Sequence, residues 1–233
     1  MTGAGGMPWR SWRHLTKIDP DKPLGTDQVR AIAGSGTDAI VLGGTQGVTS
    51  EKVAQLLDRF AAAPCPVLIE VSSSASLVPG AAAYLIPVVL NAGDPHWLIG
   101  AHRDAVLAYG PALPWDLTLS EGYVVLNPGA AVAELTGARP PSSPEEVVAY
   151  AVCGEKVFGL PLIYLEYSGI YGDPRLVAMV RSALTTSRLF YGGGIEGPDQ
   201  AREMGELADT IVVGNLAHAA DWRRLCQTVR AVK

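Results

Sequence analysis

The most constraining feature of the sequence is a regular alternation of apolar, extended segments with segments of helical spacing. Most of the extended segments precede a stretch in which apolar residues recur every three or four positions. Eight such units in this order predict an α/β fold, a single closed (β/α)8 barrel of parallel strands. An open doubly wound sheet is the alternative, but Asp19-Pro20 stands after the first strand where that fold needs a glycine-rich turn. The expected strands are His14–Ile18, Asp38–Leu42, Pro66–Val71, Tyr84–Val89, Gly122–Leu126, Leu162–Tyr167, Arg188–Tyr191 and Thr210–Val213.

The predicted helices begin with residues that are typical of helix N-termini. Asp-Pro or Ser-Pro starts three of them, which supplies a capping side chain and a proline in the first turn. The unit after the third strand, Ser72–Ala83, is too short and too rich in glycine and proline for a full helix. Asn127–Pro141 is expected to be a loop with one short helical turn. The predicted helices are Thr26–Ala33, Thr49–Ala62, Asp94–Ala108, Ser143–Phe158, Asp173–Leu184, Pro198–Leu207 and Ala217–Val232.

Composition limits the partners and the cellular compartment. The 233 residues include 18 basic and 23 acidic side chains, a net charge of −5 that argues against nucleic acid as a partner. The longest apolar run, 81–90, is interrupted by Pro87 and is too short to span a membrane. The segment 9–13, with two tryptophans and two arginines, leaves transient membrane contact open. Three cysteines without metal-ligand spacing predict reduced thiols in a cytoplasmic protein.

No linker or change of composition divides the chain. Residues 1–233 are therefore predicted to form one domain, in which residues 1–12 are a flexible N-terminus.

The first expected strand ends with two charged residues. In a (β/α)8 barrel, functional side chains lie at the C-terminal ends of the strands. Lys17 and Asp19 are two residues apart, so both point into the barrel if Leu15 does. The lysine could bind a phosphate and the aspartate could be an oxygen ligand for Mg²⁺. A structural ion pair at the barrel mouth explains the pair equally well.

The sixth expected strand ends with polar groups on one face. Tyr164, Glu166 and Ser168 alternate with Leu165 and Tyr167, which belong to the other face. Strands of a parallel barrel are usually apolar on both sides, so this polar face indicates a site. The alternative is a buried carboxylate whose hydrogen bonds are satisfied by the two tyrosines.

Glycine-rich turns follow the seventh and eighth strands, at Gly192–Gly194 and Gly214-Asn215. Backbone N–H groups in such turns form the anion cradle of phosphate-binding barrels, although a glycine triplet can also be only a tight turn. After the second strand, Thr45 offers a hydroxyl near Asp19. Glu70, at the end of the third strand, has no assigned role.

These segments, in this order, resemble the geranylgeranylglyceryl and heptaprenylglyceryl phosphate synthase family. The similarity runs from about residue 14 to residue 217, and YLEYSG followed by FYGGGI is its most specific part. The matching segments are Lys17–Pro20, Ser35–Ile40, Gly43–Thr45, Leu68–Ser72, Pro87–Asn91, Glu121–Tyr123, Leu126–Pro128, Tyr164–Gly169, Tyr171–Pro174, Tyr191–Ile195 and Val213–Asn215.

The resemblance implies a modified TIM barrel whose third helix is replaced by a short irregular segment, and a homodimer. It implies a prenyltransferase that forms an ether between sn-glycerol 1-phosphate and C1 of a polyprenyl diphosphate, releasing diphosphate with Mg²⁺. Asp19 and Thr45 would hold the Mg²⁺. Glu166 and Tyr164 would be catalytic, the glutamate either as the base or as a stabiliser of the carbocation. The residues expected to bind glycerol phosphate are Lys17, Tyr164, Leu165, Glu166, Tyr167, Ser168, Gly169, Gly194, Gly214 and Asn215.

The prenyl tail needs an apolar groove, expected around Leu77, Val78, Pro79, Tyr84 and Ile86. The resemblance also implies that bulk on the helix after the fourth strand sets the depth of this groove. Ala101, Ala105 and Ala108 are small, which favours a long, heptaprenyl-type substrate. The alternatives are a sugar-phosphate isomerase or lyase, and a phosphate-binding barrel that has lost catalysis.

Overall fold

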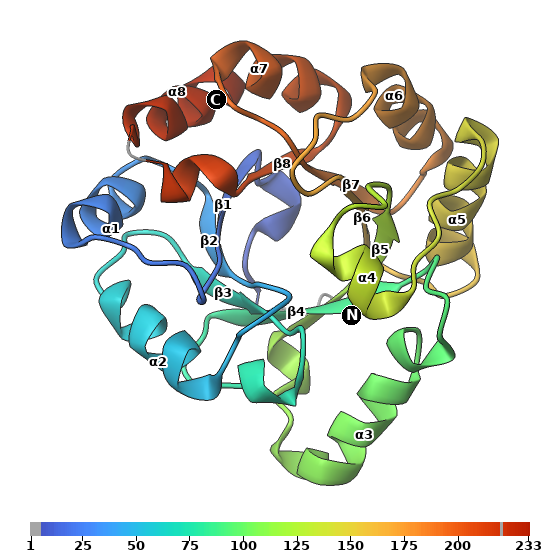
Figure 1. Ribbon diagram of the computed structural model, residues 1–233, viewed down its shortest axis with the longest axis horizontal. Helices are drawn as coiled ribbons and strands as arrows, with labels where there is room; N and C mark the ends of the chain where they lie inside the picture. The colour runs from blue at the N-terminus through green and yellow to red at the C-terminus, as the bar shows by residue number, and fades with distance from the viewer. Residues whose placement is uncertain (1–5, 220) are drawn as a thin grey trace.

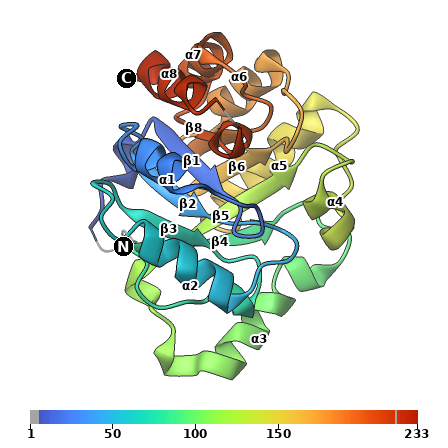
Figure 2. The ribbon, with the colours of Figure 1, turned by 60° about the vertical axis from the view of Figure 1, so that its left-hand side comes forward.

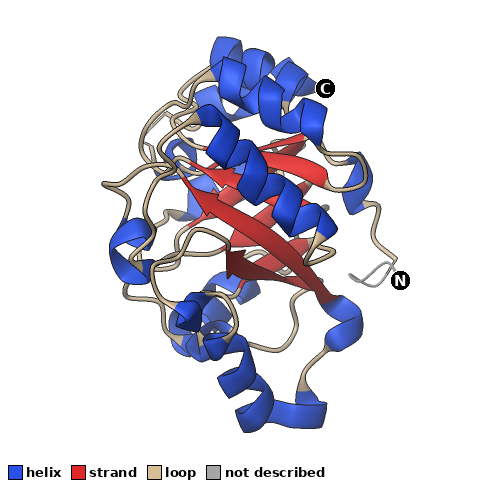
Figure 3. Cartoon of the chain, turned by 90° about the vertical axis from the view of Figure 1, so that its right-hand side faces the viewer, coloured by secondary structure: helices blue, strands red, loops and turns tan. Residues whose placement is uncertain are grey.

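The computed structural model describes residues 6–219 and 221–233, which form a closed ring of parallel strands surrounded by helices (Figure 1). Each strand pairs with the next one along the chain, and β8 pairs with β1. Figure 3 shows the strands enclosed between helices. The predicted (β/α)8 barrel is therefore confirmed. The strands are β1 (His14–Ile18), β2 (Ala39–Leu42), β3 (Val67–Glu70), β4 (Ala83–Val89), β5 (Thr118–Val125), β6 (Leu162–Glu166), β7 (Arg188–Gly192) and β8 (Thr210–Val213).

The α-helices lie outside the strands and largely follow the predicted order. Capping side chains define several of their starts, as Ser143 does when it accepts a bond from the N–H of Glu146. The short segment α4 is the helical turn expected between 127 and 141. The helices are α1 (Thr26–Ala33), α2 (Ser50–Arg59), α3 (Gly100–Tyr109), α4 (Ala131–Thr136), α5 (Pro144–Lys156), α6 (Pro174–Ala183), α7 (Pro198–Leu207) and α8 (Arg223–Val232).

Two predicted helices are divided. Asp94 caps only the 3-10 turn η3 (Pro95–Trp97), and the extended φ of −146° at Ile99 separates that turn from α3. The last helix is divided into the 3-10 turn η6 (Asn215–His218) and α8, because Asp221 accepts a bond from the N–H of Arg223 and starts a new helix. Strand β5 also begins at Thr118, four residues earlier than predicted, since 118–121 pair with β4.

The unit after β3 lacks a full helix, as expected. Only the 3-10 turn η2 (Ser74–Ser76) lies between β3 and β4. The next helix, α3, projects away from the barrel (Figure 2), and none of its residues, all of them described, is buried. One side of the barrel is therefore covered by loops and by α3 rather than by a packed helix.

Buried side chains form two layers. Alternate residues of each strand pack inside the ring, as Leu15 and Leu68 do, or outward against the helices, as Ile18 and Ile40 do. Trp9, in the 3-10 turn η1 (Trp9–Ser11), belongs to the inner layer and is only 2% exposed. The expectation of a flexible N-terminus through residue 12 is therefore wrong for this part, because apolar burial fixes it; residues 1–5 lie outside the described ranges.

Within the described ranges, no helix has the length and apolar character needed to cross a membrane. Cys65, Cys153 and Cys226 are free thiols.

Candidate active site

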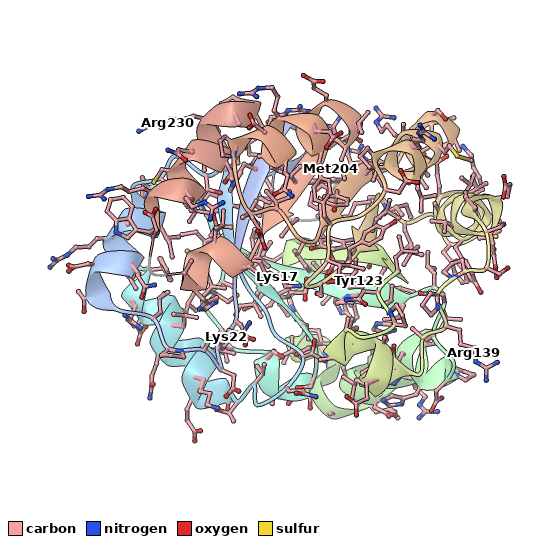
Figure 4. The ribbon with its side chains drawn as sticks, turned by 45° about the horizontal axis from the view of Figure 1, so that its top comes forward. Lys17, Lys22, Tyr123, Arg139, Met204 and Arg230 are labelled. Carbon is pink, nitrogen blue, oxygen red and sulfur yellow. The ribbon has the colours of Figure 1, made fainter. Side chains whose placement is uncertain are left out.

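A polar pocket opens at the C-terminal ends of the strands. Residues predicted from five separate strand ends line it, which places Lys17, Glu166 and the glycine turn after β7 together. Figure 4 shows Lys17 and Tyr123 near the middle of the ring. Of the predicted site residues, those that line the polar pocket are Lys17, Asp19, Thr45, Tyr164, Glu166, Ser168, Gly169, Gly194, Gly214 and Asn215.

Two of the predicted glycerol phosphate residues do not line this pocket. Leu165 and Tyr167 face outward and belong to the layer packed against the helices. The period of two along β6 explains this result, since their neighbours Tyr164 and Glu166 face the barrel interior. The side chains of Leu165 and Tyr167 therefore support the pocket wall from behind, and the part of these two residues in binding glycerol phosphate stays a prediction.

Lys17 is held by an acidic cage at the centre of the mouth. Its Nζ lies 2.7 and 2.9 Å from the two carboxylate oxygens of Glu70 and 4.0 Å from Glu166 Oε2. It also donates to the hydroxyl of Tyr123 at 3.1 Å. Burial lowers the pKa of Lys17, but the carboxylates of Glu70 and Glu166 outweigh it and raise the pKa above its ordinary value. The raised pKa favours the charged form of Lys17.

Glu166 accepts three hydrogen bonds. Oε1 accepts bonds from the backbone N–H and the hydroxyl of Ser168, and Oε2 accepts from the Tyr123 hydroxyl at 2.7 Å. The Tyr123 ring stacks on Tyr164, with centroids 4.6 Å apart and an angle of 8°. Burial and then the charge of Glu166 raise the pKa of both tyrosines well above 10, so both stay neutral.

The glycine turn after β7 is required by close packing. A Cβ atom on Gly192 would collide with the Tyr164 hydroxyl, and one on Gly194 would collide with the backbone of Tyr171. Gly194 also has a φ of +57°, a conformation that favours glycine. The turn therefore brings bare backbone to the pocket wall, as an anion cradle needs.

The residues predicted to hold Mg²⁺ lie at the pocket rim. Asp19 and the hydroxyl-bearing Thr45 both line the polar pocket, and so does Asp21, which was not among the predicted ligands. A Cβ on Gly44 would lie 2.5 Å from Asp19 Oδ1, so this glycine lets the loop after β2 approach the carboxylate. Mg²⁺ is commonly held by one or two carboxylates, with the remaining oxygens supplied by substrate phosphates and water. The donor set fits that mode of binding, although no cluster of three metal-binding side chains occurs in 6–219 and 221–233.

An apolar groove runs from the pocket toward α3. Leu77 and Ile86 line it, as predicted, and Ala101 and Ala105 form its wall on α3. Ala108 is exposed and does not line the groove, although it lies on the same face of α3 as residues 101 and 105, one turn further along the helix. Tyr84 packs in the outer layer and donates its hydroxyl proton to the Val78 carbonyl, so neither residue provides groove surface. Pro79 is likewise not part of the lining.

Four residues of the site were not assigned a role from the sequence. Glu70, Glu121 and Tyr123 point into the barrel, and His218 lines the pocket and accepts the N–H of Asp19 at 3.1 Å. The period-two rule applied to the third and fifth strands would have found the first three. No sequence pattern marked His218, because the break between η6 and α8 sets its position.

Fold and site together define a phosphate-binding (β/α)8 barrel enzyme whose anion pocket adjoins an apolar groove. The chain belongs to the PcrB family, whose model matches residues 7–233. It is 45% identical over 227 residues to the heptaprenylglyceryl phosphate synthase of Brevibacillus brevis, which covers 97% of this chain and 98% of that one. It is also 45% identical to the geranylgeranylglyceryl phosphate synthase of Haloquadratum walsbyi, over 97% and 95% of the two chains.

A solved structure agrees with these relatives. The (S)-3-O-geranylgeranylglyceryl phosphate synthase of Thermoplasma acidophilum, in complex with sn-glycerol-1-phosphate, superposes with a TM-score of 0.87 at 25% identity. The match covers 100% of this chain and 99% of that one. The chain is therefore a prenyltransferase, and the family predicted from the sequence is confirmed.

Proposed function

We propose that this enzyme joins one hydroxyl of sn-glycerol 1-phosphate to C1 of a long polyprenyl diphosphate, forming an ether and releasing diphosphate. One observation carries the proposal. The polar pocket and the apolar groove share a wall, and Lys17, Thr45 and Glu166 line both cavities. A small phosphorylated alcohol in the pocket would thus face the head of an isoprenoid whose tail lies in the groove.

The pocket supplies the groups that glycerol phosphate needs. Its phosphate would lie against the backbone of Gly194 and Gly214, within reach of Lys17. Its reacting hydroxyl would lie at Glu166, which takes up the hydroxyl proton as the C–O bond forms. The electron pair of the breaking C1–O bond leaves with the diphosphate. The neutral, electron-rich ring of Tyr164 lies beside this point and would stabilise positive charge on C1.

We further propose that Mg²⁺ is required, held by Asp19 and Thr45 together with the diphosphate. When bound, the ion neutralises the charge that develops on the leaving group. Asp19 is the anchoring carboxylate. Its backbone N–H donates to His218 Nε2, and its Oδ1 accepts from the N–H of Asp21, so these two bonds set its orientation.

A long prenyl chain, of heptaprenyl type, fits the small side chains at the groove wall. Ala101 and Ala105 leave room between β4 and α3, where a bulky residue would close the groove. We also propose a homodimer in the cytoplasm. Free cysteines fit that compartment. Light scattering tests the homodimer, and cell fractionation tests the cytoplasmic location.

The experiment is a direct assay with labelled glycerol 1-phosphate, Mg²⁺ and prenyl diphosphates of several lengths. We expect a radiolabelled ether that extracts into organic solvent, with the highest kcat/KM for the longer chains. Chelation of Mg²⁺ should abolish product formation, and readdition of Mg²⁺ should restore it. Absence of ether with every length would contradict the proposal and return attention to a sugar-phosphate isomerase or a non-catalytic binding module.

A further inference from the structure

Tyr123 forms a bridge between two carboxylates that face the reaction site. Its hydroxyl lies 2.7 Å from Glu166 Oε2 and 3.4 Å from Glu70 Oε2. A phenol has one proton to donate, so only one of the two carboxylates can accept it at a time. The three side chains come from β5, β6 and β3, and all three are buried. This geometry is a hydrogen-bonded path with two proton-accepting ends.

Lys17 couples one end of the path to the substrate. In this structure its ammonium is bound by both oxygens of Glu70. The same lysine lines the polar pocket in which, by the proposed function, the phosphate of glycerol phosphate lies. Glu70 and the phosphate therefore compete for one cation. When the phosphate takes Lys17, Glu70 is left as a buried carboxylate without its counter-ion, which makes it a better proton acceptor.

We infer that Glu70 is the final acceptor of the proton released by the glycerol hydroxyl, which reaches it from Glu166 through the hydroxyl of Tyr123. The inference rests on the proposed function and adds a second carboxylate to it. Binding of the phosphate to Lys17 prepares Glu70 for this step. Glu166 is then returned to its charged form while the ether product is still bound.

The step balances as follows. The glycerol O–H bond breaks, its oxygen bonds to prenyl C1, and the pair of the C1–O bond leaves on diphosphate. Glu166 Oε2 receives the proton. It passes that proton to the Tyr123 oxygen as the original hydroxyl proton of Tyr123 moves to Glu70 Oε2. Because burial raises the pKa of Tyr123 well above 10, a free tyrosinate is disfavoured and the two transfers occur together.

The site is reset from the groove side. Glu70 lines the apolar groove and is 7% exposed, so its proton can leave to water there once the product departs. Return of Lys17 to the Glu70 carboxylate favours that loss, since a nearby ammonium stabilises the charged form. Each turnover would thus move Lys17 from Glu70 to the phosphate and back.

Two variants and their combination test the path. Glu70→Gln frees Lys17, so calorimetry should show glycerol 1-phosphate binding that is as tight as in the wild type or tighter. Steady-state kcat should fall by about 10²-fold, the usual size of a proton-transfer contribution. Tyr123→Phe should also lower kcat. The kcat of the double variant should be no lower than the kcat of the less active single variant, because both substitutions interrupt one path.

A matched control lies outside both cavities. Glu203 accepts a hydrogen bond from Tyr171 at 2.6 Å, and Glu203→Gln should leave both kcat and binding unchanged. Thermal melting establishes that every variant is folded. A purely structural Glu70 would weaken glycerol phosphate binding with little effect on kcat, and independent residues would give multiplied losses in the double variant. Either result overturns the inference.

Failure of the proposed function can be distinguished from failure of the proton path. If the wild-type enzyme yields no ether with any prenyl diphosphate, the reaction itself is wrong. If the wild-type enzyme is active and Glu70→Gln matches its kcat, only the proton path is wrong. If the Glu70→Gln variant does not fold, Tyr123→Phe provides the test. It should lower kcat, while calorimetry should still show binding of glycerol 1-phosphate. Unchanged kcat in that variant also overturns the path.

Discussion

Lys17 is the residue at which the two cavities meet, and its contacts show how a buried cation is kept available for an anion. Glu70 and Glu166 surround it, so its charge is neutralised within the protein in the absence of a ligand. A lone lysine in this position would carry a large cost of desolvation. The acidic neighbours reduce that cost, and by the proposed function the substrate phosphate replaces them around Lys17.

Asp19 is predicted to act on the leaving group and not on glycerol phosphate. Asp19→Ala should lower turnover by about 10²-fold or more, the scale seen when one group that stabilises developing charge is removed. Calorimetry should show glycerol 1-phosphate binding close to that of the wild type. Equal losses of turnover and binding would mean that Asp19 supports the pocket structurally through the Asp21 N–H bond it accepts.

Glu121 is the least satisfied group in the barrel. It is fully buried, and neither carboxylate oxygen has a hydrogen-bond partner among the described residues. Burial and then the charge of Glu70 raise its pKa well above 4.5, so the folded protein holds a proton there that the unfolded chain releases. Protonated Glu121 therefore contributes to the free energy of unfolding at low pH. This contribution is lost as the pH rises from about 4.5 toward the raised pKa of Glu121.

Glu121→Gln removes this dependence because the amide does not titrate. The melting temperature of the variant relative to wild type should increase by about 3–5 °C per pH unit within that window. Melting curves collected between pH 5 and pH 8 test the expectation. A difference that stays constant with pH would mean that Glu121 is ionised in the folded state.

At the residue scale, the sequence allowed prediction of most of the polar pocket. Period two along β1 and β6 correctly placed Lys17 and Glu166 inside the barrel and Tyr167 outside it. The network among Glu70, Tyr123 and Glu166 could not be predicted, since it depends on the distances between side chains from three strands. Such distances follow from barrel closure and stagger, which a single segment does not encode.

At the scale of the element, α3 is the part of the chain that shapes the groove. Its first turns bring Ala101 and Ala105 to the groove wall, one helical turn apart. Its boundaries differed from prediction because Asp94 caps a separate 3-10 turn. Periodicity in sequence does not reveal this kind of division, since the residues on both sides of Ile99 have acceptable helical spacing.

Ala101→Trp is predicted to shorten the preferred prenyl chain. The indole would fill groove space next to Ala105, so the ratio of kcat/KM for long over short prenyl diphosphates should fall roughly tenfold or more. Competition between two labelled chain lengths measures that ratio. Leu107→Trp is the control, because Leu107 is 78% exposed and lies on another face of α3, outside the groove, and it should leave the ratio unchanged.

At the scale of the whole molecule, the two ends of the barrel have separate tasks. The C-terminal ends of the strands carry the pocket, while Trp9 and Trp12 pack in the inner layer near the start of β1. The alternation of segments was sufficient to predict the closed ring. It could not predict that the chain before β1 is buried, since two tryptophans near a terminus are also compatible with an exposed segment.

Trp12→Ala is predicted to lower stability without altering the chemistry. Trp12 is 5% exposed, and truncation of a buried tryptophan typically costs about 3–5 kcal/mol, which lowers Tm by about 10 °C in a chain of this size. Measured well below the new Tm, kcat should be close to wild type. A large loss of kcat in the folded variant would mean that the two ends are coupled.

Because α3 contributes no described side chain to the core, its sequence can drift with little penalty in folding free energy. By the proposed function, the residues that α3 presents to the isoprenoid can therefore change while the barrel keeps its shape. Selectivity for the length of the prenyl tail can therefore evolve independently of the chemistry in the polar pocket. A library of variants restricted to the groove-facing side of α3 offers a route to enzymes for tails of chosen length.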